Sequence, residues 1–201
     1  TYMPSVLVET GFLTNSSEGS FLNSSKGQNQ MASAISKAII NYKNQRQADV
    51  QNELITTVNL EPEKKIKALD LGTGSGIIAI TLSEKCPKWE ISATDCSIEA
   101  LDIAKHNAIR DIDFYCGSWF EPLPRKKFDL IVSNPPYISK NDPHLEDLRF
   151  EPIEALVSGS DGLEDIRIII SQSPQFLCRG GILLLEHGYN QKDSIVELLE
   201  K

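Results

Sequence analysis

The chain has 201 residues, of which 40% are hydrophobic and 24% charged, an ordinary composition for a globular protein. No apolar run approaches the roughly 20 residues that a membrane-spanning helix needs, and the start lacks the basic and apolar stretches of a signal peptide. This length accommodates one well-buried domain with an appended segment. We therefore expect a cytoplasmic protein with no membrane partner.

The net charge is −8, and residues 50–201 carry 16 basic against 25 acidic side chains. Such a surplus repels polyphosphates at long range, so a nucleic-acid partner is disfavoured, although a local basic groove stays open. The four cysteines stand far apart, without a C-x-x-C pair. Reduced thiols and no metal site are therefore expected.

The first 45 residues differ in character from the rest of the chain. They begin with a short apolar strand, Val6-Leu7-Val8, and continue through a loop rich in Asn, Ser and Gly. A helix is predicted from about Gln28 to Tyr42, because apolar side chains recur there on one face. Residues 46–61 are polar and predict a linker or a short helix.

From residue 66 onward, strand-like and helix-like patterns alternate regularly. Strands are predicted at 66–71, 90–95, 112–116, 128–133 and 180–186. Helices are predicted at about 76–86, 97–109, 162–176 and 190–200. This order predicts an α/β fold with a doubly wound, mostly parallel sheet and helices on both faces. The connection 134–160 is long for such a fold, and long loops there tend to be functional.

A glycine-rich turn stands between the first of these strands and its helix, in LDLGTGSGIIAI. Glycines permit positive φ and let the backbone approach a ligand, next to the unpaired N–H groups of a helix start. A dinucleotide fingerprint would need glycine at position 77, which is Ile77. The G-x-G-x-G spacing favours a ligand without a pyrophosphate, such as S-adenosylmethionine. The predicted cofactor loop comprises Gly72, Thr73, Gly74, Ser75 and Gly76.

Two further residues follow predicted strands. Asp95 ends the second strand, where a carboxylate can accept both hydroxyls of an adenosine ribose. A tight turn with Asp95 or Ser97 capping the next helix is the structural alternative, and a nicotinamide cofactor also stays open. Trp119 follows the third strand and is a candidate for one face of an adenine slot, or a core residue.

The stretch IVSNPPYIS ends a buried strand on Asn134, Pro135, Pro136 and Tyr137. The prolines fix φ and carry no N–H, so the turn is stiff and rich in acceptors, beside an aromatic ring. Such a corner suits a planar –NH2 group, whose two hydrogens bind two acceptors. Methyl transfer to that nitrogen depends mainly on placement and on the electron density gained by hydrogen donation. The alternative is a turn that only terminates the strand.

These motifs, with GSWF, DPHL, RFEPIEALVSGSDGL and GGILLLEHG, resemble the release factor glutamine methyltransferase family over about residues 62–201. NPPY alone is shared with enzymes that methylate DNA adenine, whereas the DPHL…RFEP loop is more specific. The resemblance implies an S-adenosylmethionine-dependent methyltransferase fold. It also implies methylation of the glutamine in the Gly-Gly-Gln motif of peptide-chain release factors.

The resemblance also implies roles for individual residues. Gly72 to Gly76 would wrap the methionine end of the cofactor, Asp95 would bind the ribose, and Trp119 and Asn134 would complete the cofactor site. Ser118 departs from the Asp often found before that Trp.

For the substrate, Asn134 and Pro135 would orient the glutamine amide and Tyr137 would pack over it, which makes these three the catalytic candidates. Pro136 would line the same site. Glu151 would shape the substrate loop, with a helix cap or an ion pair as the alternative.

The family's N-terminal docking domain and its PRPETE-like segment have no counterpart in the sequence, and two last strands would be expected beyond Lys201. Residues 1–45 instead resemble the end of a zinc-dependent N-acetylmuramoyl-L-alanine amidase, in which Glu9 would match a catalytic Glu. The zinc ligands have no counterpart here, so no amidase activity is expected.

Three alternatives to the glutamine methyltransferase stay open. The first is an amino-methyltransferase acting on nucleic-acid bases. The second is a non-catalytic remnant that binds the cofactor, and the third, for residues 1–45 only, is a fragment of a cell-wall amidase.

Overall fold

The computed structural model describes residues 5–7, 65–146, 148 and 150–200. Within them, six parallel strands form one sheet in the order β1-β6-β5-β2-β3-β4. The strands are β1 (Ser5–Leu7), β2 (Lys67–Leu71), β3 (Glu90–Asp95), β4 (Asp113–Cys116), β5 (Phe128–Ser133) and β6 (Leu177–Leu185). The α/β prediction of a parallel sheet is confirmed.

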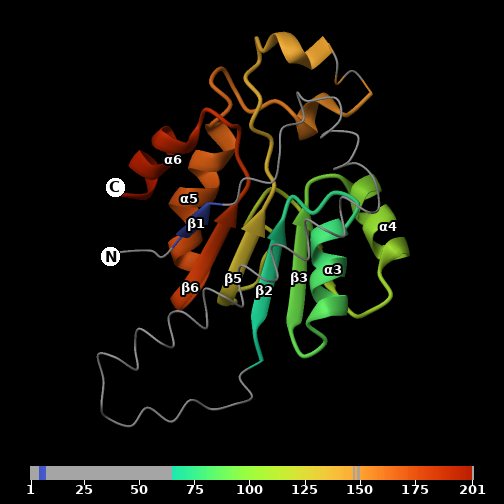
Figure 1. The fold of residues 1–201 in the computed structure, drawn as a ribbon. Coiled ribbons are helices and arrows are strands. Elements are labelled where there is room, and N and C mark those ends of the chain that lie inside the picture. Colours follow the sequence, from blue (N-terminus) through green and yellow to red (C-terminus); the bar gives the residue numbers. More distant parts are fainter. Residues whose placement is uncertain (1–4, 8–64, 147, 149, 201) are drawn as a thin grey trace, which may run out of the picture.

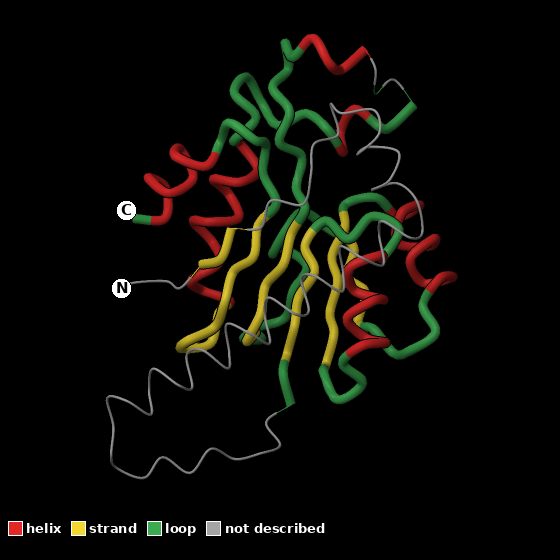
Figure 2. The backbone as a smooth tube through the Cα atoms, viewed as in Figure 1, coloured by secondary structure: helices red, strands yellow, loops and turns green. Residues whose placement is uncertain are grey.

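Helices cover both sides of the sheet (Figures 1 and 2). They are α3 (Ile77–Lys85), α4 (Ile98–Asn107), α5 (Glu164–Phe176) and α6 (Lys192–Leu199), with the short 3-10 helices η1 (Pro143–Glu146) and η2 (Ile153–Ala155). Among the described residues, no helix is long and apolar enough to cross a bilayer.

Alternation along the strands divides the core into two layers, because neighbouring side chains point to opposite faces. On β2, Ala68 packs with the buried side of α3, while Leu69 packs with α5 and α6. Both faces are therefore covered, and the central strands β2, β3 and β5 are largely buried on both sides, as is usual in parallel sheets, whereas the edge strand β4 is partly exposed.

The strand order reverses between β2 and β5. From β2 the chain moves outward through β3 to β4, then returns to pair β5 with the other side of β2. In open α/β sheets, ligands bind at the carboxyl ends of the strands beside such a switch point. Because the strands are parallel, their carboxyl ends share one edge of the sheet, the upper edge in Figure 1, and the chain after β5 continues above that edge.

The element boundaries differ from the predictions in one instructive place. The strand expected at 180–186 begins at Leu177, which pairs with Phe128 before the register shifts. Gly180 has φ +76°, and a Cβ on Gly181 would lie 3.0 Å from the carbonyl oxygen of Phe128. The two glycines form an irregularity inside the strand, whereas the sequence pattern placed them at its start.

The predicted N-terminal strand is present in part. Ser5 to Leu7 pairs with Leu183 to Leu185 in parallel, which adds β1 at the outer edge of β6. The other predictions for the first 61 residues, namely the helix at 28–42, the catalytic candidate Glu9 and the linker at 46–61, lie outside the described residues. The division into an amidase-like segment, a linker and a methyltransferase domain over 62–201 stays a prediction.

Candidate active site

Four of the loops named in the sequence analysis converge on the carboxyl edge of the sheet. Gly72 to Gly76 follows β2, Asp95 ends β3, Trp119 follows β4, and Asn134 to Tyr137 follows β5. Because β2 and β5 are paired, the glycine loop and the proline turn leave the sheet side by side: the Ser133 hydroxyl donates to the carbonyl oxygen of Leu71 at 2.8 Å.

Asp95 links the glycine loop to the next helix. Its Oδ2 accepts the N–H of Gly74 at 2.8 Å, and its Oδ1 accepts the N–H of Ser97 at 2.9 Å. Ser97 in turn caps α4, its hydroxyl accepting the N–H of Ala100 at 3.0 Å. The structural reading of Asp95 as a turn residue is therefore correct. Each carboxylate oxygen can still accept a hydrogen bond from a ligand hydroxyl. The geometry is therefore compatible with Asp95 both as a turn residue and as a ribose acceptor.

The three glycines of the loop have different surroundings. All have positive φ, at +66° for Gly72, +55° for Gly74 and +87° for Gly76. A Cβ on Gly74 would meet nothing within 4 Å, whereas one on Gly76 would lie 2.9 Å from the Cβ of Ala104 and 2.8 Å from Ile80. Gly74 thus borders open space, and Gly76 allows α3 and α4 to pack closely.

Trp119 lies against the glycine loop. A Cβ on Gly72 would be 3.2 Å from the Trp119 ring, which is half-buried and packs on the core. Its φ of +44° is a left-handed conformation that is costly for a bulky residue. The next residue, Phe120, is buried and stacks on Phe176 with a centroid distance of 4.6 Å. Packing of this pair holds the turn that carries Trp119.

The proline turn presents one exposed amide beside buried or half-buried neighbours. Asn134 is exposed, Pro135 is buried, and Pro136 and Tyr137 are half-buried. The Tyr137 hydroxyl donates to Glu186 Oε1 at 3.4 Å. Burial, and then the Glu186 charge, raise the pKa of Tyr137 well above its ordinary value of 10, so the hydroxyl keeps its proton.

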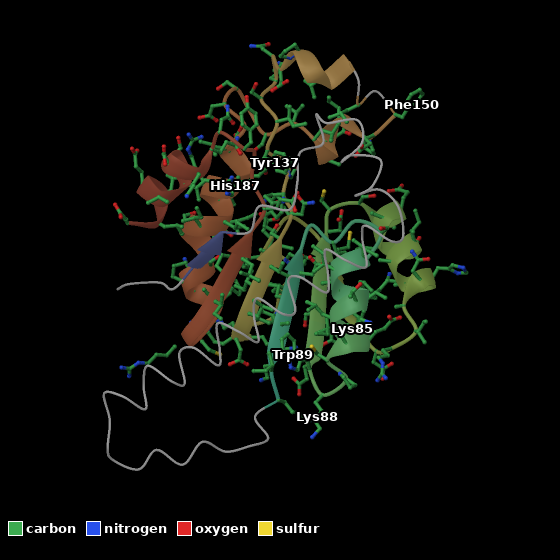
Figure 3. All side chains as sticks on the ribbon, viewed as in Figure 1. Lys85, Lys88, Trp89, Tyr137, Phe150 and His187 are labelled. Atoms are coloured by element: carbon green, nitrogen blue, oxygen red, sulfur yellow. The ribbon has the colours of Figure 1, made fainter. Side chains whose placement is uncertain are left out.

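Glu151 lies between η1 and η2 on the segment above the sheet edge, and its side chain is exposed. Its charge also contributes to raising the pKa of Tyr137, so the fold brings it within electrostatic reach of that hydroxyl. Figure 3 places Tyr137 and His187 near the carboxyl edge, and Trp89 at the opposite end of the sheet. Glu151 is therefore close enough to affect Tyr137, which lies at the same edge as the proline turn.

The sequence reading missed one residue, Asp70. It is 1% exposed within β2, and its Oδ2 accepts the Thr73 hydroxyl at 2.6 Å and the N–H of Ala79 at 3.0 Å. Its Oδ1 is buried without a hydrogen-bond partner. Burial raises the pKa of Asp70 to about 7, with the Asp95 charge adding to the rise. The sequence signal that could have identified Asp70 is an acidic residue inside the mostly apolar strand KALDL.

The chain matches the methyltransferase small domain family over residues 44–149. It belongs to this family. Residues 1–41 match the N-acetylmuramoyl-L-alanine amidase family, which confirms the second resemblance.

Curated relatives confirm the first resemblance. The release factor glutamine methyltransferase of Coxiella burnetii is 48% identical over 146 residues, covering 71% of this chain and 53% of the relative. That of Escherichia coli K12 is 46% identical over 140 residues, covering 67% and 50%. The chain thus spans about half the length of the curated relatives it matches.

Solved structures show the same fold. A methyltransferase from Pyrococcus furiosus superposes with a TM-score of 0.51 at 20% identity, covering 68% of this chain and 63% of that one. The amino pentose methyltransferase CalS10 from Micromonospora echinaspora gives 0.51 at 15% identity, covering 90% and 59%. The Rossmann-like methyltransferase fold is therefore confirmed.

We predict that Gly76→Ala destabilises the protein more than Gly74→Ala. Both substitutions force a side chain into a left-handed conformation, at a cost of about 1 to 2 kcal/mol. Gly76→Ala also pushes α3 from α4, adding at least about 1 kcal/mol, as overpacking does. Denaturant unfolding of the matched pair measures the difference. Equal losses of unfolding free energy would contradict the packing role of Gly76.

We predict a pH-dependent stability difference between the wild type and Asp70→Asn. The folded-state pKa, about 7, lies above the ordinary 3.8. The contribution of Asp70 to stability is therefore full below the ordinary pKa and is lost as the pH rises through the folded one. Relative to Asp70→Asn, the wild type should lose on the order of 4 kcal/mol across this window, since one pKa unit corresponds to about 1.4 kcal/mol. Urea unfolding at several pH values measures this, and a constant difference would refute it.

Proposed function

We propose that this chain binds S-adenosylmethionine at the carboxyl edge of β2, β3 and β4 and methylates a side-chain amide nitrogen held at the Asn134 turn. The substrate is the glutamine in the Gly-Gly-Gln motif of a peptide-chain release factor. The observation that carries this proposal is the juxtaposition of two loops: the G-x-G-x-G loop and the Asn-Pro-Pro-Tyr turn leave paired neighbouring strands at the switch point.

The residues present fit such a cofactor. Gly74 offers an uncrowded backbone, and the half-buried Asp95 carboxylate stands at the end of the adjacent strand. The Trp119 ring provides an aromatic surface against the same loop. Asp70 lies directly beneath the loop with one unpartnered oxygen, and a cationic ligand nearby would favour its ionised form. When bound, the cofactor supplies a methyl group activated by a sulfonium.

Asn134 and the main chain of the turn are the proposed orienting groups for the substrate amide. The Asn134 side-chain oxygen accepts one amide hydrogen, and a main-chain carbonyl of the proline turn accepts the other. Donation of both hydrogens aims the nitrogen and raises its electron density as the bond forms. The half-buried Tyr137 covers the amide with its ring, and its protonated hydroxyl adds no negative charge beside it.

A protein substrate is favoured over a nucleic-acid base by the segment above the site. Between residues 138 and 163 the sequence has six acidic and two basic side chains. It also presents Phe150, 85% exposed, and Ile153, 52% exposed. An acidic loop with exposed apolar side chains repels phosphates and suits a polypeptide. Relatives named release factor glutamine methyltransferases support the same substrate.

The membership in a methyltransferase family supports a catalytic role against the alternative of a non-catalytic remnant. The alternative of an amidase fragment concerns residues 1–45 only, and Glu9 lies outside the described residues. We propose a cytoplasmic location, since the substrate belongs to translation termination.

Two substitutions should separate cofactor binding from transfer. Asn134→Ala removes a proposed amide acceptor, so turnover should fall about 100-fold or more with little change in cofactor affinity, as expected for loss of orientation. Asp95→Ala removes the proposed ribose acceptor and should weaken binding of S-adenosylhomocysteine about 10-fold or more, the loss of a charge-assisted hydrogen bond.

The measurements are calorimetric titration with S-adenosylhomocysteine and transfer of a labelled methyl group to a purified release factor. A release factor with Gly-Gly-Ala in place of Gly-Gly-Gln serves as the control and should stay unlabelled. Methylation of DNA in place of the release factor would overturn the substrate assignment. Collapse of cofactor affinity in Asn134→Ala would overturn the role of that residue.

A further inference from the structure

The turn of Asn134 to Tyr137 makes hydrogen bonds with residues that lie far away in the sequence. Pro135 and Pro136 have no N–H groups, so within the turn they contribute only acceptors. The two prolines therefore cannot donate to any partner, and the donor that contacts the last carbonyl of the turn comes from a residue 54 positions away in the sequence.

That donor is the side chain of Gln191, which is only 7% exposed and stands directly before α6. Its Nε2 donates to the carbonyl oxygen of Tyr137 at 2.9 Å. The same nitrogen lies 3.2 Å from the carbonyl oxygen of Gly162 and 3.4 Å from that of Asp161. Its Oε1 accepts the N–H of Gly188 at 2.8 Å, which fixes the orientation of the amide.

Gly162 shows how closely these segments approach. It has φ +76°, and a Cβ there would lie 2.3 Å from the carbonyl oxygen of Tyr137 and 2.7 Å from Gln191 Nε2. No side chain fits in that space. The turn after β5, the turn before α5 and the turn before α6 therefore meet at one buried amide.

Tyr137 is also held at its other end by the same stretch of chain. Its hydroxyl donates to Glu186, at the end of β6, while its carbonyl accepts from Gln191. Directly after Tyr137, the N–H of Ile138 donates to the carbonyl oxygen of Leu156 at 2.9 Å. This bond links the turn to the segment that follows η2. The position of the ring and the direction of the turn are thus set by residues 186–191.

We propose that Gln191 is a positioning residue for methyl transfer: it does not touch the substrate, but it fixes the turn that orients the substrate amide. This inference rests on the proposed function. It identifies a contact that acts on transfer and leaves the cofactor loop untouched. Among the described residues, the hydrogen bonds of the Gln191 side chain go to segments on the β5 and β6 side of the switch point.

The test uses Gln191→Glu, which has nearly the same shape. The new carboxyl group can still accept the N–H of Gly188, but when ionised it cannot donate to the carbonyl oxygen of Tyr137. We expect kcat to fall about 10-fold or more, as for a displaced reacting group. Binding of S-adenosylhomocysteine should stay within about threefold, because the cofactor loop is intact.

The pH profile supplies a readout that a general loss of folding would not produce. Three carbonyl oxygens around the new carboxyl group favour its protonated form, which has one hydrogen to donate. The deficit in kcat should therefore shrink as the pH is lowered, relative to the wild type at each pH. Asn190→Ala, an exposed neighbour outside the contact, is the matched control and should keep wild-type kcat.

Amide hydrogen exchange tests the contact without relying on activity. The N–H groups of Ile138 and Lys140, just after the turn, donate to the carbonyl oxygens of Leu156 and Gly159. In Gln191→Glu, exchange should accelerate at these two amides and stay slow at Gly188, whose N–H keeps an acceptor. Gly162→Ala disturbs the same contact sterically, because the added Cβ would crowd the Tyr137 carbonyl oxygen and Gln191 Nε2. It should therefore accelerate exchange at the same two amides.

Unchanged kcat together with unchanged exchange at Ile138 would overturn the proposal. A parallel fall in kcat, cofactor affinity and unfolding free energy would also overturn it, because Gln191 would then serve folding in general. A wild-type chain that binds the cofactor but labels no release factor refutes the proposed function instead. The exchange pattern then decides by itself whether Gln191 holds the turn.

Discussion

The parallel pairing of β2 with β5, registered so that Leu71 faces Ser133, is the constraint on which the site depends. It brings together two loops separated by about sixty residues of intervening chain, and it does so at the only kind of sheet position where neighbouring loops diverge. The buried hydrogen bond from the Ser133 hydroxyl to the carbonyl oxygen of Leu71 joins the ends of the two strands just before the loops begin. Every proposed contact of cofactor and substrate is made from this edge.

Two carboxylates near the glycine loop illustrate how burial assigns different roles to the same chemical group. Asp95 is half-buried and accepts two backbone N–H groups, so it organises the loop, and it is the proposed ribose acceptor. Asp70 is fully enclosed, and its pKa is raised toward neutrality. Asp95 bonds to the middle of the loop, at Gly74, whereas Asp70 bonds to Thr73 and the start of α3.

The proline turn, the proposed substrate side of the site, is held by longer-range contacts than the glycine loop, the proposed cofactor side. The cofactor loop is a local turn between a strand and the helix that follows it, whereas the proline turn is held by Gln191 and Glu186 from the end of the described chain. The two prolines make the turn stiff, but their fixed φ angles do not determine where the turn points relative to the rest of the fold. The packing of α5 and α6 on the sheet supplies that direction through the Tyr137 carbonyl and hydroxyl.

The sequence by itself determined the alternation of strands and helices, the glycine loop, the strand-end Asp95 and the Asn134 turn, because each rests on local periodicity or on the conformational limits of glycine and proline. It did not determine that Gly76 accommodates Ala104, that Asp70 is enclosed, that Trp119 lies on Gly72, or that Gln191 holds Tyr137. These facts depend on which distant segments meet. Only the tertiary structure decided them, since burial and close approach are properties of the packed chain and leave no local pattern.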